Sequence, residues 1–338
     1  MTGERPVIAL AMVPGLEALL LTPEHWRRLE AVGSVVDRRP LARFEEATDV
    51  LGRVEVLLTG WGCPALTTEV LDAAPRLRLV AHAAGTVRDF VAPFVLERGI
   101  RVSTAADANA IPVAEFTVAA ILFAGKGVFL ARERYRATRE PPLLLTGRVG
   151  NNGAVIGIVG ASRIGRRVIE RLRPYDLELL VSDPYLDPGE ADRLGVELLA
   201  LDELLRRSDV VSLHAPATAE TRGMLGAAEL ALLRDGATLV NTARGSLVDP
   251  VALDAELVSG RINAVLDVTE PPRLPADSPL FELPNVFLTP HIAGSGGNEL
   301  HRLADSAVAE IERFCATGEL EHEVTLAVLA TMTESAYG

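Results

Sequence analysis

The 338-residue sequence is poor in lysine, cysteine and aromatic residues, and its apolar runs are short. Lys126 is the only lysine, and the net charge of −13 argues against nucleic acid or an anionic membrane as a partner, because like charges repel. Cys63 and Cys315 lie far apart and in no metal-ligand spacing, so we expect no metal, no disulfide framework and a reducing cytoplasmic environment. No apolar stretch approaches the ~20 residues that a membrane helix needs.

The N-terminal segment also lacks the features of a secretory signal. The apolar run Val7–Val13 has no basic leader and no small-residue cleavage site, and Pro14 and Gly15 close it. We therefore expect a first buried strand there. The length of the chain predicts two domains, and an apolar share of 49% is enough to fill a large core.

Regular alternation of apolar and amphipathic segments begins near Val155. The apolar runs include AVIGIVG, LELLVSD, DVVSLHAP, ATLVNTARG and INAVLDV. Buried runs of Val, Leu and Ile that alternate with helices are typical of βαβ units on a parallel sheet. This region is predicted to be a doubly wound α/β domain.

The first hundred residues repeat this alternation more loosely, in PVIALAM, VEVLLTG, RLRLVAHAAG and IRVST. They predict a second, smaller α/β domain. An Ala-rich apolar helix is expected to begin near Pro112 and to link the two domains. A second long helix, at about 297–317, is expected to return the chain to the first domain, which makes that domain discontinuous.

The stretch GIVGASRIG, residues 157–165, lies between a predicted strand and a predicted helix at 163–173, where a dinucleotide-binding loop belongs. Gly160 permits the tight turn, and Gly165 lets the helix pack close to the strand. The amides at the helix N-terminus then point at a pyrophosphate. Ser162 stands where G-x-G-x-x-G has its middle glycine. Either its hydroxyl donates to a phosphate oxygen and binding is weakened but retained, or the pocket has decayed.

An acidic residue follows at the distance that such a loop requires. The next predicted strand, LLVSDPY, ends at Asp183, about twenty residues past the loop. A carboxylate there binds the adenosine ribose hydroxyls and repels a 2′-phosphate, and no Arg or Lys follows closely. This favours NAD over NADP. The alternative is that Asp183 is a turn residue before Pro184.

Several motifs together resemble one family. GIVGASRIG, SDVVSLHAP, NTARGSLVD, NAVLDV and LPADSPLFELPNVFLTPHIAG occur in the order and spacing of the D-2-hydroxyacid dehydrogenases, of the glyoxylate (hydroxypyruvate) reductase and phosphoglycerate dehydrogenase type. The match runs from about Ala105 to Ala293, and the N-terminal part, with LVAHAAGTV and ERGIRV, resembles the family more loosely.

The resemblance implies two doubly wound parallel-sheet domains. A central Rossmann NAD domain, residues 108–296, is inserted in a smaller flavodoxin-like substrate domain, residues 1–107 plus 297–338, with the active site in the cleft between. It also implies NAD-dependent interconversion of a small 2-keto acid and its D-2-hydroxy acid, in a cytoplasmic homodimer.

The resemblance also assigns roles to residues. Arg244 of NTARG is the implied substrate-binding arginine, and His291 of TPHIAG is the implied acid/base. The substrate carboxylate is implied to bind the backbone of Gly85, Thr86 and Val87, although AAGTVRDF departs from the glycine-rich pattern of the family. The residues implied in cofactor binding are Gly160, Ser162, Arg163, Ile164, Asp183, Ala215, Pro216, Thr242, Arg244, Asp267, His291 and Gly294.

These residue types suit the reduction of a 2-keto acid. Arginine offers a planar, permanently charged fork of donors for the carboxylate and the carbonyl oxygen. Histidine titrates near neutral pH and can supply the proton that an alkoxide needs. Taken singly, an arginine after a strand is often an ion-pair partner, and a histidine there can satisfy a helix terminus. The other histidines, His25, His82, His214, His301 and His322, carry no motif of their own.

The glutamate that normally partners the catalytic histidine in this family is ambiguous here. In LDVTEPPRLPADSPL, Glu270 before Pro271 is one candidate, whereas a gap-free alignment places Pro272 at that position. A neighbouring carboxylate raises the pKa of a histidine, so its loss moves reduction to lower pH. The departures at Ser162 and Pro272 leave a second interpretation open, a non-catalytic NAD(H)-binding sensor on the same scaffold.

Overall fold

The computed structural model describes residues 5–141 and 148–332. Contacts within the chain divide it into two compact units. Unit 1 comprises the described parts of 1–109 and 295–338, and unit 2 comprises those of 110–294. The domain boundaries expected from the sequence, after residues 107 and 296, stay a prediction.

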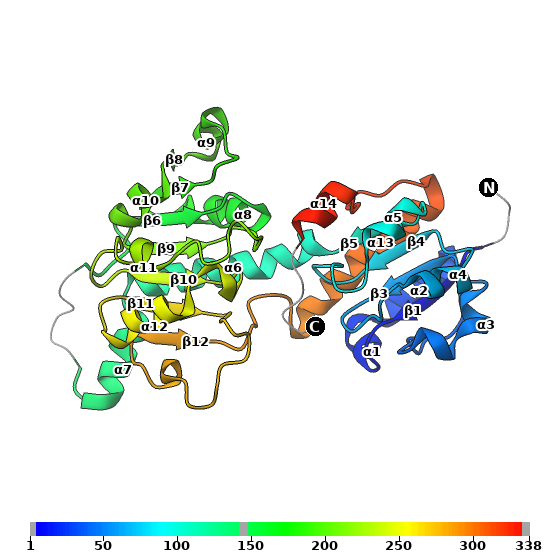
Figure 1. The fold of residues 1–338 in the computed structure, drawn as a ribbon, viewed down its shortest axis with the longest axis horizontal. Helices are drawn as coiled ribbons and strands as arrows, with labels where there is room; N and C mark the ends of the chain where they lie inside the picture. The colour runs from blue at the N-terminus through cyan, green and yellow to red at the C-terminus, as the bar shows by residue number, and fades with distance from the viewer. Residues whose placement is uncertain (1–4, 142–147, 333–338) are drawn as a thin grey trace. The chain divides into compact units, whose positions relative to one another are not determined.

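Unit 1 is built on a parallel sheet whose five described strands run in the order β2-β1-β3-β4-β5 (Figure 1). The strands are β1 Val7–Ala11, β2 Ser34–Val35, β3 Val56–Thr59, β4 Leu79–His82 and β5 Arg101–Thr104. This order is that of flavodoxin-like doubly wound sheets. The three central strands, β1, β3 and β4, are almost wholly buried, as their apolar runs predict.

Helices cover both faces of the unit 1 sheet. One face carries α1 Leu16–Leu20, α2 Pro23–Val32 and α13 Leu300–Thr317. The other carries the short helix η1 Phe44–Glu46, α3 Thr48–Leu51, α4 Thr68–Ala73, α5 Pro93–Glu97 and α14 Leu326–Thr331. Helix α13 returns from near the end of the chain and packs on α1, α2 and β4, so the unit is discontinuous in sequence.

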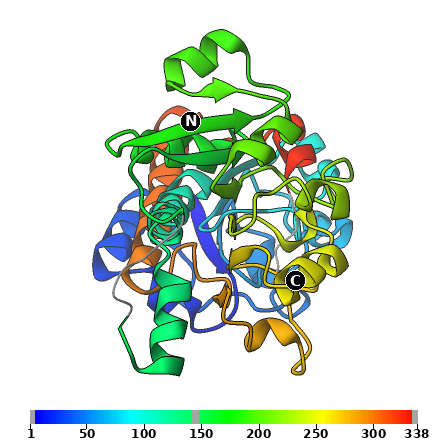
Figure 2. The same ribbon diagram turned by 90° about the vertical axis from the view of Figure 1, so that its left-hand side faces the viewer.

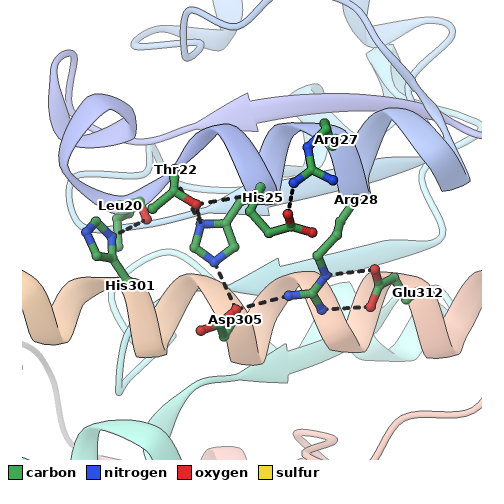
Figure 3. Close-up of polar contacts among 9 residues, drawn as sticks. Leu20, Thr22, His25, Arg27, Arg28, His301, Asp305 and Glu312 are labelled. Atoms are coloured by element: carbon green, nitrogen blue, oxygen red, sulfur yellow. Dashed lines mark hydrogen bonds and ion pairs between the residues drawn. The ribbon is translucent and has the colours of Figure 1, made fainter.

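A polar network joins α2 to α13 (Figure 3). The His25 ring accepts a hydrogen bond from the Thr22 backbone at 3.0 Å through Nδ1, and its Nε2 lies 3.0 Å from Asp305 Oδ1. The Arg28 guanidinium contacts Asp305 at 3.0 Å and Glu312 at 2.7 Å. His25 is therefore a satisfied core histidine, which ties the first segment of unit 1 to the last.

Unit 2 is built on a parallel sheet whose seven described strands run in the order β12-β11-β10-β9-β6-β7-β8 (Figures 1 and 2). The strands are β6 Ala154–Val159, β7 Leu177–Ser182, β8 Glu197–Leu198, β9 Val210–Leu213, β10 Thr238–Asn241, β11 Asn263–Leu266 and β12 Val286–Leu288. From β8 to β11 this is the Rossmann order, and β12 extends the far edge. The predicted fold class is therefore confirmed for both units.

Helices also cover both faces of the unit 2 sheet. One face carries α6 Ala106–Gly125, α8 Arg163–Leu172 and α9 Pro188–Leu194, and the other carries α10 Leu201–Arg207, α11 Ala227–Leu230 and α12 Pro250–Val258. Helix α7 Val128–Thr138 contains no buried residue. The short 3-10 helices η2 Gly245–Leu247 and η3 Pro279–Phe281 belong to unit 2, and η4 Gly297–Glu299 precedes α13 in unit 1.

Two expectations about the Ala-rich segment are wrong: that its helix begins near Pro112, and that no apolar stretch approaches the length of a membrane helix. Its helix begins at Ala106, not near Pro112, which lies inside α6. The high helix propensity of alanine and the packing of the helix offset the one backbone donor that proline lacks. Helix α6 is also 20 residues long, and an 18-residue stretch of it has a mean hydropathy of 1.5, enough to span a membrane by length and composition. Asp107 and Glu115 interrupt the run of apolar residues in the sequence, but the helix continues through both positions. A core helix passes the same test, so this is weak evidence for a membrane.

Candidate functional site

The turn after β6 lies where the strand order of the unit 2 sheet reverses, between β6 and β9. Gly160 has a φ of +98°, and a Cβ on it would lie 2.6 Å from the backbone nitrogen of Ala215. A Cβ on Gly165 would lie 2.1 Å from the carbonyl oxygen of Gly160. Both positions exclude any larger residue, so α8 starts pressed against the end of β6. Such switch points are where doubly wound sheets bind nucleotides.

Ser162 is the N-cap residue of α8. Its φ of −67° and ψ of −178° are accessible to any L-residue, and its Oγ accepts a hydrogen bond from Gly165 N at 3.4 Å. Serine is among the preferred N-cap residues because its oxygen satisfies an otherwise unpaired amide. N-capping of α8 therefore explains why a serine occupies this position. The sequence could have indicated this role, because Ser162 directly precedes the predicted helix.

Asp183 follows β7 and contacts the same turn. Its Oδ2 accepts a hydrogen bond from Ala161 N at 2.7 Å, and its Oδ1 accepts one from Tyr185 N at 2.8 Å. The carboxylate thus supports the loop and also shapes the turn that follows β7. Each carboxylate oxygen can accept more than one hydrogen bond, so these contacts leave capacity for a ligand hydroxyl.

His214 ends the run after β9 and lies beside the start of α8. The ring is buried, its Nε2 lies 2.9 Å from Ser212 Oγ, and its Cβ is near Gly165. Burial lowers the pKa of His214 to about 3, so the ring is neutral at physiological pH. Ala215 lies against Gly160, and the Pro216 carbonyl accepts a hydrogen bond from Thr221.

Arg244 follows β10 in a tightly held turn. The Asn241 side chain donates to the Arg244 carbonyl at 2.8 Å and accepts from Ala243 N at 3.1 Å. A Cβ on Gly245 would lie 2.1 Å from the carbonyl carbon of Thr269, so this turn packs directly on the segment after β11. Thr242, in the same turn, is buried and contacts Thr117 of α6 through the two hydroxyl oxygens at 2.7 Å.

Asp267 is buried after β11 and clasps the loop that carries His291. Its Oδ1 accepts hydrogen bonds from Thr289 Oγ1 at 2.6 Å and Ile292 N at 2.8 Å. Its Oδ2 accepts one from Ala293 N at 2.9 Å, and its carbonyl accepts one from His291 N at 3.0 Å. Sequence reasoning gave Asp267 a role beside the cofactor and missed this clasp.

His291 has a strained backbone conformation, and two charged side chains act on its ring. Its φ of +56° is in the left-handed region, which costs a residue with a Cβ and persists only where the surroundings enforce it. Burial lowers the pKa of His291, the Asp267 carboxylate raises it, and the Arg244 guanidinium lowers it again, with a net shift downward. The structure therefore brings both Arg244 and Asp267 within electrostatic range of His291.

Glu270 lies in the segment against which Gly245 packs. Its bond to Pro271 is cis, and it lines a small cavity of about 20 Å³ together with Asn241 and Asp254. That volume holds about one water molecule. The pairing of Glu270 with His291 stays a prediction.

The predicted carboxylate loop of unit 1 follows β4. Thr86 Oγ1 accepts a hydrogen bond from Arg88 N at 3.2 Å, and Arg88 Nη1 donates to the Leu329 carbonyl of α14 at 3.0 Å. Gly85, Thr86 and Val87 all have negative φ angles. The turn of AAGTVRDF therefore needs no glycine at the positions where the family pattern has them, and the Thr86 side chain stabilises it locally. Val87 is fully buried.

No group of three or more His, Cys, Asp or Glu side chains that could hold a metal ion occurs within residues 5–141 and 148–332. Unit 2 instead combines a crowded glycine turn at a switch point, an acid on the next strand, and an arginine and a histidine that share one electrostatic environment. This set defines a dinucleotide-dependent dehydrogenase class. Residues 118–293 match the family model of the D-isomer specific 2-hydroxyacid dehydrogenase NAD binding domain, and the chain belongs to that family.

Known relatives agree with this assignment. The chain is 34% identical over 305 residues to D-3-phosphoglycerate dehydrogenase of Methanocaldococcus jannaschii, with 88% of this chain and 56% of that protein covered. It is 34% identical over 255 residues to glyoxylate reductase of Korarchaeum cryptofilum, with 74% and 76% covered. A solved structure of a phosphoglycerate oxidoreductase from Rhizobium etli has a TM-score of 0.78 and 26% identity, with 95% and 99% covered. The chain spans about half the length of the D-3-phosphoglycerate dehydrogenases that it matches.

Proposed function

We propose that the protein is an NAD-dependent oxidoreductase that interconverts a small 2-keto acid and its D-2-hydroxy acid. The observation that carries this proposal is that the Arg244 guanidinium acts electrostatically on the His291 ring. Asp267 holds the loop of His291 by hydrogen bonds, at the same edge of the sheet as the Gly160 turn. All described strands of this sheet are parallel, so the residues that follow them gather at one edge. A protein that only bound the dinucleotide would have no use for a proton donor there.

Unit 2 is the proposed cofactor domain and unit 1 the proposed substrate domain. The first amides of α8, at Arg163 and Ile164, would hold the pyrophosphate, and Asp183 would bind the adenosine ribose. NAD supplies or accepts the hydride when bound. The remaining proposed cofactor contacts are Gly160, Ser162, Ala215, Pro216, Thr242, Arg244, Asp267, His291 and Gly294.

His291 and Arg244 are the proposed catalytic residues. The His291 imidazolium donates a proton to the oxygen that becomes the hydroxyl during reduction, and the neutral imidazole takes it back during oxidation. The Arg244 guanidinium binds the substrate and polarises its carbonyl. Because the pKa of His291 is lowered, reduction is expected to speed up as the pH falls below the ordinary histidine range.

Glu270 is the proposed partner of His291. If its carboxylate supports the imidazolium, Glu270→Gln lowers the pKa of His291, so the alkaline limb of the kcat/KM profile for reduction, where the rate falls as pH rises, shifts to lower pH. An unchanged profile assigns that role to another residue or to none.

Gly85, Thr86 and Val87 are the proposed carboxylate-binding segment of the substrate domain. The names of the relatives, glyoxylate reductase and hydroxypyruvate reductase, support a small 2-keto acid as substrate. We also propose a homodimer in the cytoplasm. An exposed aromatic group supports it, in which Phe123 is 52% exposed and the rings of Phe129 and Phe287 stack at 4.5 Å.

A spectrophotometric assay of NADH oxidation with glyoxylate, hydroxypyruvate, pyruvate and longer 2-keto acids tests the proposal. Turnover of at least one of them is the expected result. Tight NADH binding without turnover of any would support the sensor interpretation instead. A parallel assay with NADPH tests the preference that Asp183 predicts, since its carboxylate repels a 2′-phosphate.

A further inference from the structure

Three buried polar residues end neighbouring strands of the unit 1 sheet. Thr59 of β3, His82 of β4 and Thr104 of β5 pair with one another in the sheet register. Their exposed fractions are 0%, 3% and 6%. Buried polar side chains need hydrogen-bond partners, and these three find theirs on one another and on the backbone that follows β4.

Thr104 binds two successive carbonyls of that backbone. Its Oγ1 lies 2.8 Å from the Ala84 carbonyl oxygen and 2.8 Å from that of Gly85, so its single hydroxyl proton is shared between them. The Ala84 carbonyl also accepts a hydrogen bond from Ala105 N at 3.0 Å. Both peptides are thereby turned with their oxygens toward the end of the sheet.

His82 binds the next carbonyl. The ring makes a hydrogen bond with the Thr86 backbone that favours the protonated ring, so the ring donates and the carbonyl accepts. Its Nδ1 lies 2.9 Å from Thr59 Oγ1, and the ring of Phe90 packs 5.0 Å from it. Because burial keeps the imidazole neutral, only one ring nitrogen carries a proton. We therefore assign the bond to Thr86 to Nε2 and make Thr59 the donor to Nδ1.

The orientation of these carbonyls fixes the orientation of the amides. In a trans peptide the carbonyl of one residue and the N–H of the next point in opposite directions. The oxygens of Ala84, Gly85 and Thr86 point toward the strand ends, so the amides of Gly85 and Thr86 point away from them, on the same side. Successive amides that converge in this way form an anion-binding concavity.

We propose that Thr104 and His82 are positioning residues for substrate binding, which hold these carbonyls so that the Gly85 and Thr86 amides face the carboxylate of the 2-keto acid. This inference rests on the proposed function. It adds two side chains that touch neither substrate nor cofactor and act only through the backbone.

The central test compares Thr104→Val with Thr104→Ser. Valine keeps the shape and removes the hydroxyl, whereas serine keeps the hydroxyl. We expect Thr104→Val to raise KM for the 2-keto acid about 10-fold, as for the loss of one hydrogen bond, with kcat and the NADH dissociation constant nearly unchanged. Thr104→Ser should restore KM to near the original value.

A matched control separates positioning from general destabilisation. Ser208 is also fully buried, and its Oγ donates to the Leu204 carbonyl at 2.7 Å in unit 2. Ser208→Ala should lower stability without changing KM. His82→Met and His82→Gln form a second pair, because glutamine places an amide donor near the position of Nε2. Met should raise KM and Gln should raise it less.

An unchanged KM in folded Thr104→Val, or a Thr104→Ser variant as impaired as Thr104→Val, overturns the inference. If the original protein turns over no 2-keto acid, the proposed function fails, and the inference is then tested on binding alone. The NADH-loaded protein is titrated with oxalate while the ¹⁵N–¹H signals of Gly85 and Thr86 are followed. Smaller shifts in Thr104→Val than in Thr104→Ser support the clamp, and equal shifts contradict it.

Discussion

The two units share a doubly wound parallel sheet but present backbone amides in different ways. Unit 2 uses a helix N-terminus, brought close by the crowding of Gly160 and Gly165. Unit 1, as we infer it, uses short turns whose peptides are aimed by buried side chains from the strand ends. The arrangement in unit 2 depends on glycines that have no side chain, whereas the arrangement in unit 1 depends on buried side chains that bind the backbone. Glycine spacing therefore identifies only the first.

The largest expected effect is that of replacing His291. Comparing it with a replacement of His82 separates the chemical step from substrate positioning. His291→Gln removes the proposed proton donor, so kcat for reduction should fall about 10²- to 10⁴-fold. NADH binding, measured by fluorescence titration, should change little. The comparison predicts the opposite pattern for His82→Met, a change in KM rather than kcat. Equal losses of kcat in the two variants would break it.

A second test addresses the crowded turn of unit 2. Gly160→Ala must place a Cβ 2.6 Å from Ala215 N at a φ of +98°, so it should weaken NADH binding at least about 100-fold or unfold unit 2. Gly236→Ala is the matched control, since Gly236 has a φ of +81° but open space around it. It should cost about 1 kcal/mol of stability and leave NADH affinity intact. Equal NADH affinities in both variants would contradict the role of close approach.

A third test uses one buried histidine from each unit. Burial lowers the pKa of both His82 and His214 to about 3, against 6.5 for an unshifted histidine. The unfolded chain then binds more protons below pH 6.5, so each ring lowers the free energy of unfolding by about 1.4 kcal/mol per pH unit on acidification toward 3. This contribution to stability is fully present above pH 6.5.

Replacing one of these rings should reduce that slope. His82→Met should make the free energy of unfolding, measured by urea denaturation between pH 6 and 4.5, less dependent on pH than in the original protein. His214→Met should do the same in unit 2. An unchanged slope in either variant would show that the folded protein already binds the proton.

The smallest expected effect concerns the serine in the glycine-rich loop. Ser162→Gly removes an N-cap oxygen, which costs only a few tenths of a kcal/mol, and the backbone conformation there suits either residue. NADH affinity, measured by calorimetry, should stay within about threefold on the same grounds. A large gain in affinity would show that serine had impaired the pocket.

The fold could be predicted because apolar runs and glycine spacing are local signals. The strand of AVIGIVG, the turn at Gly160 and the acid at Asp183 all lie within one βαβ unit. The start of helix α6 was misplaced because proline is common in the first turn of a helix, whereas Pro112 lies inside α6. The clasp of Asp267 and the clamp of Thr104 could not be predicted, because each joins segments that meet only after two strands have paired.

The return of α13 to unit 1 has a consequence for how the chain is made. Leu303, Val308 and Ile311 of this helix complete the same apolar cluster as Ile8 and Leu58. When the ribosome has released the first hundred residues, only α1 and α2 cover that side of the nascent sheet, and the remaining cover must wait until the entire central segment has been translated. The central segment, which is continuous, can fold before that cover arrives, so the unit whose synthesis starts first is the last to be completed.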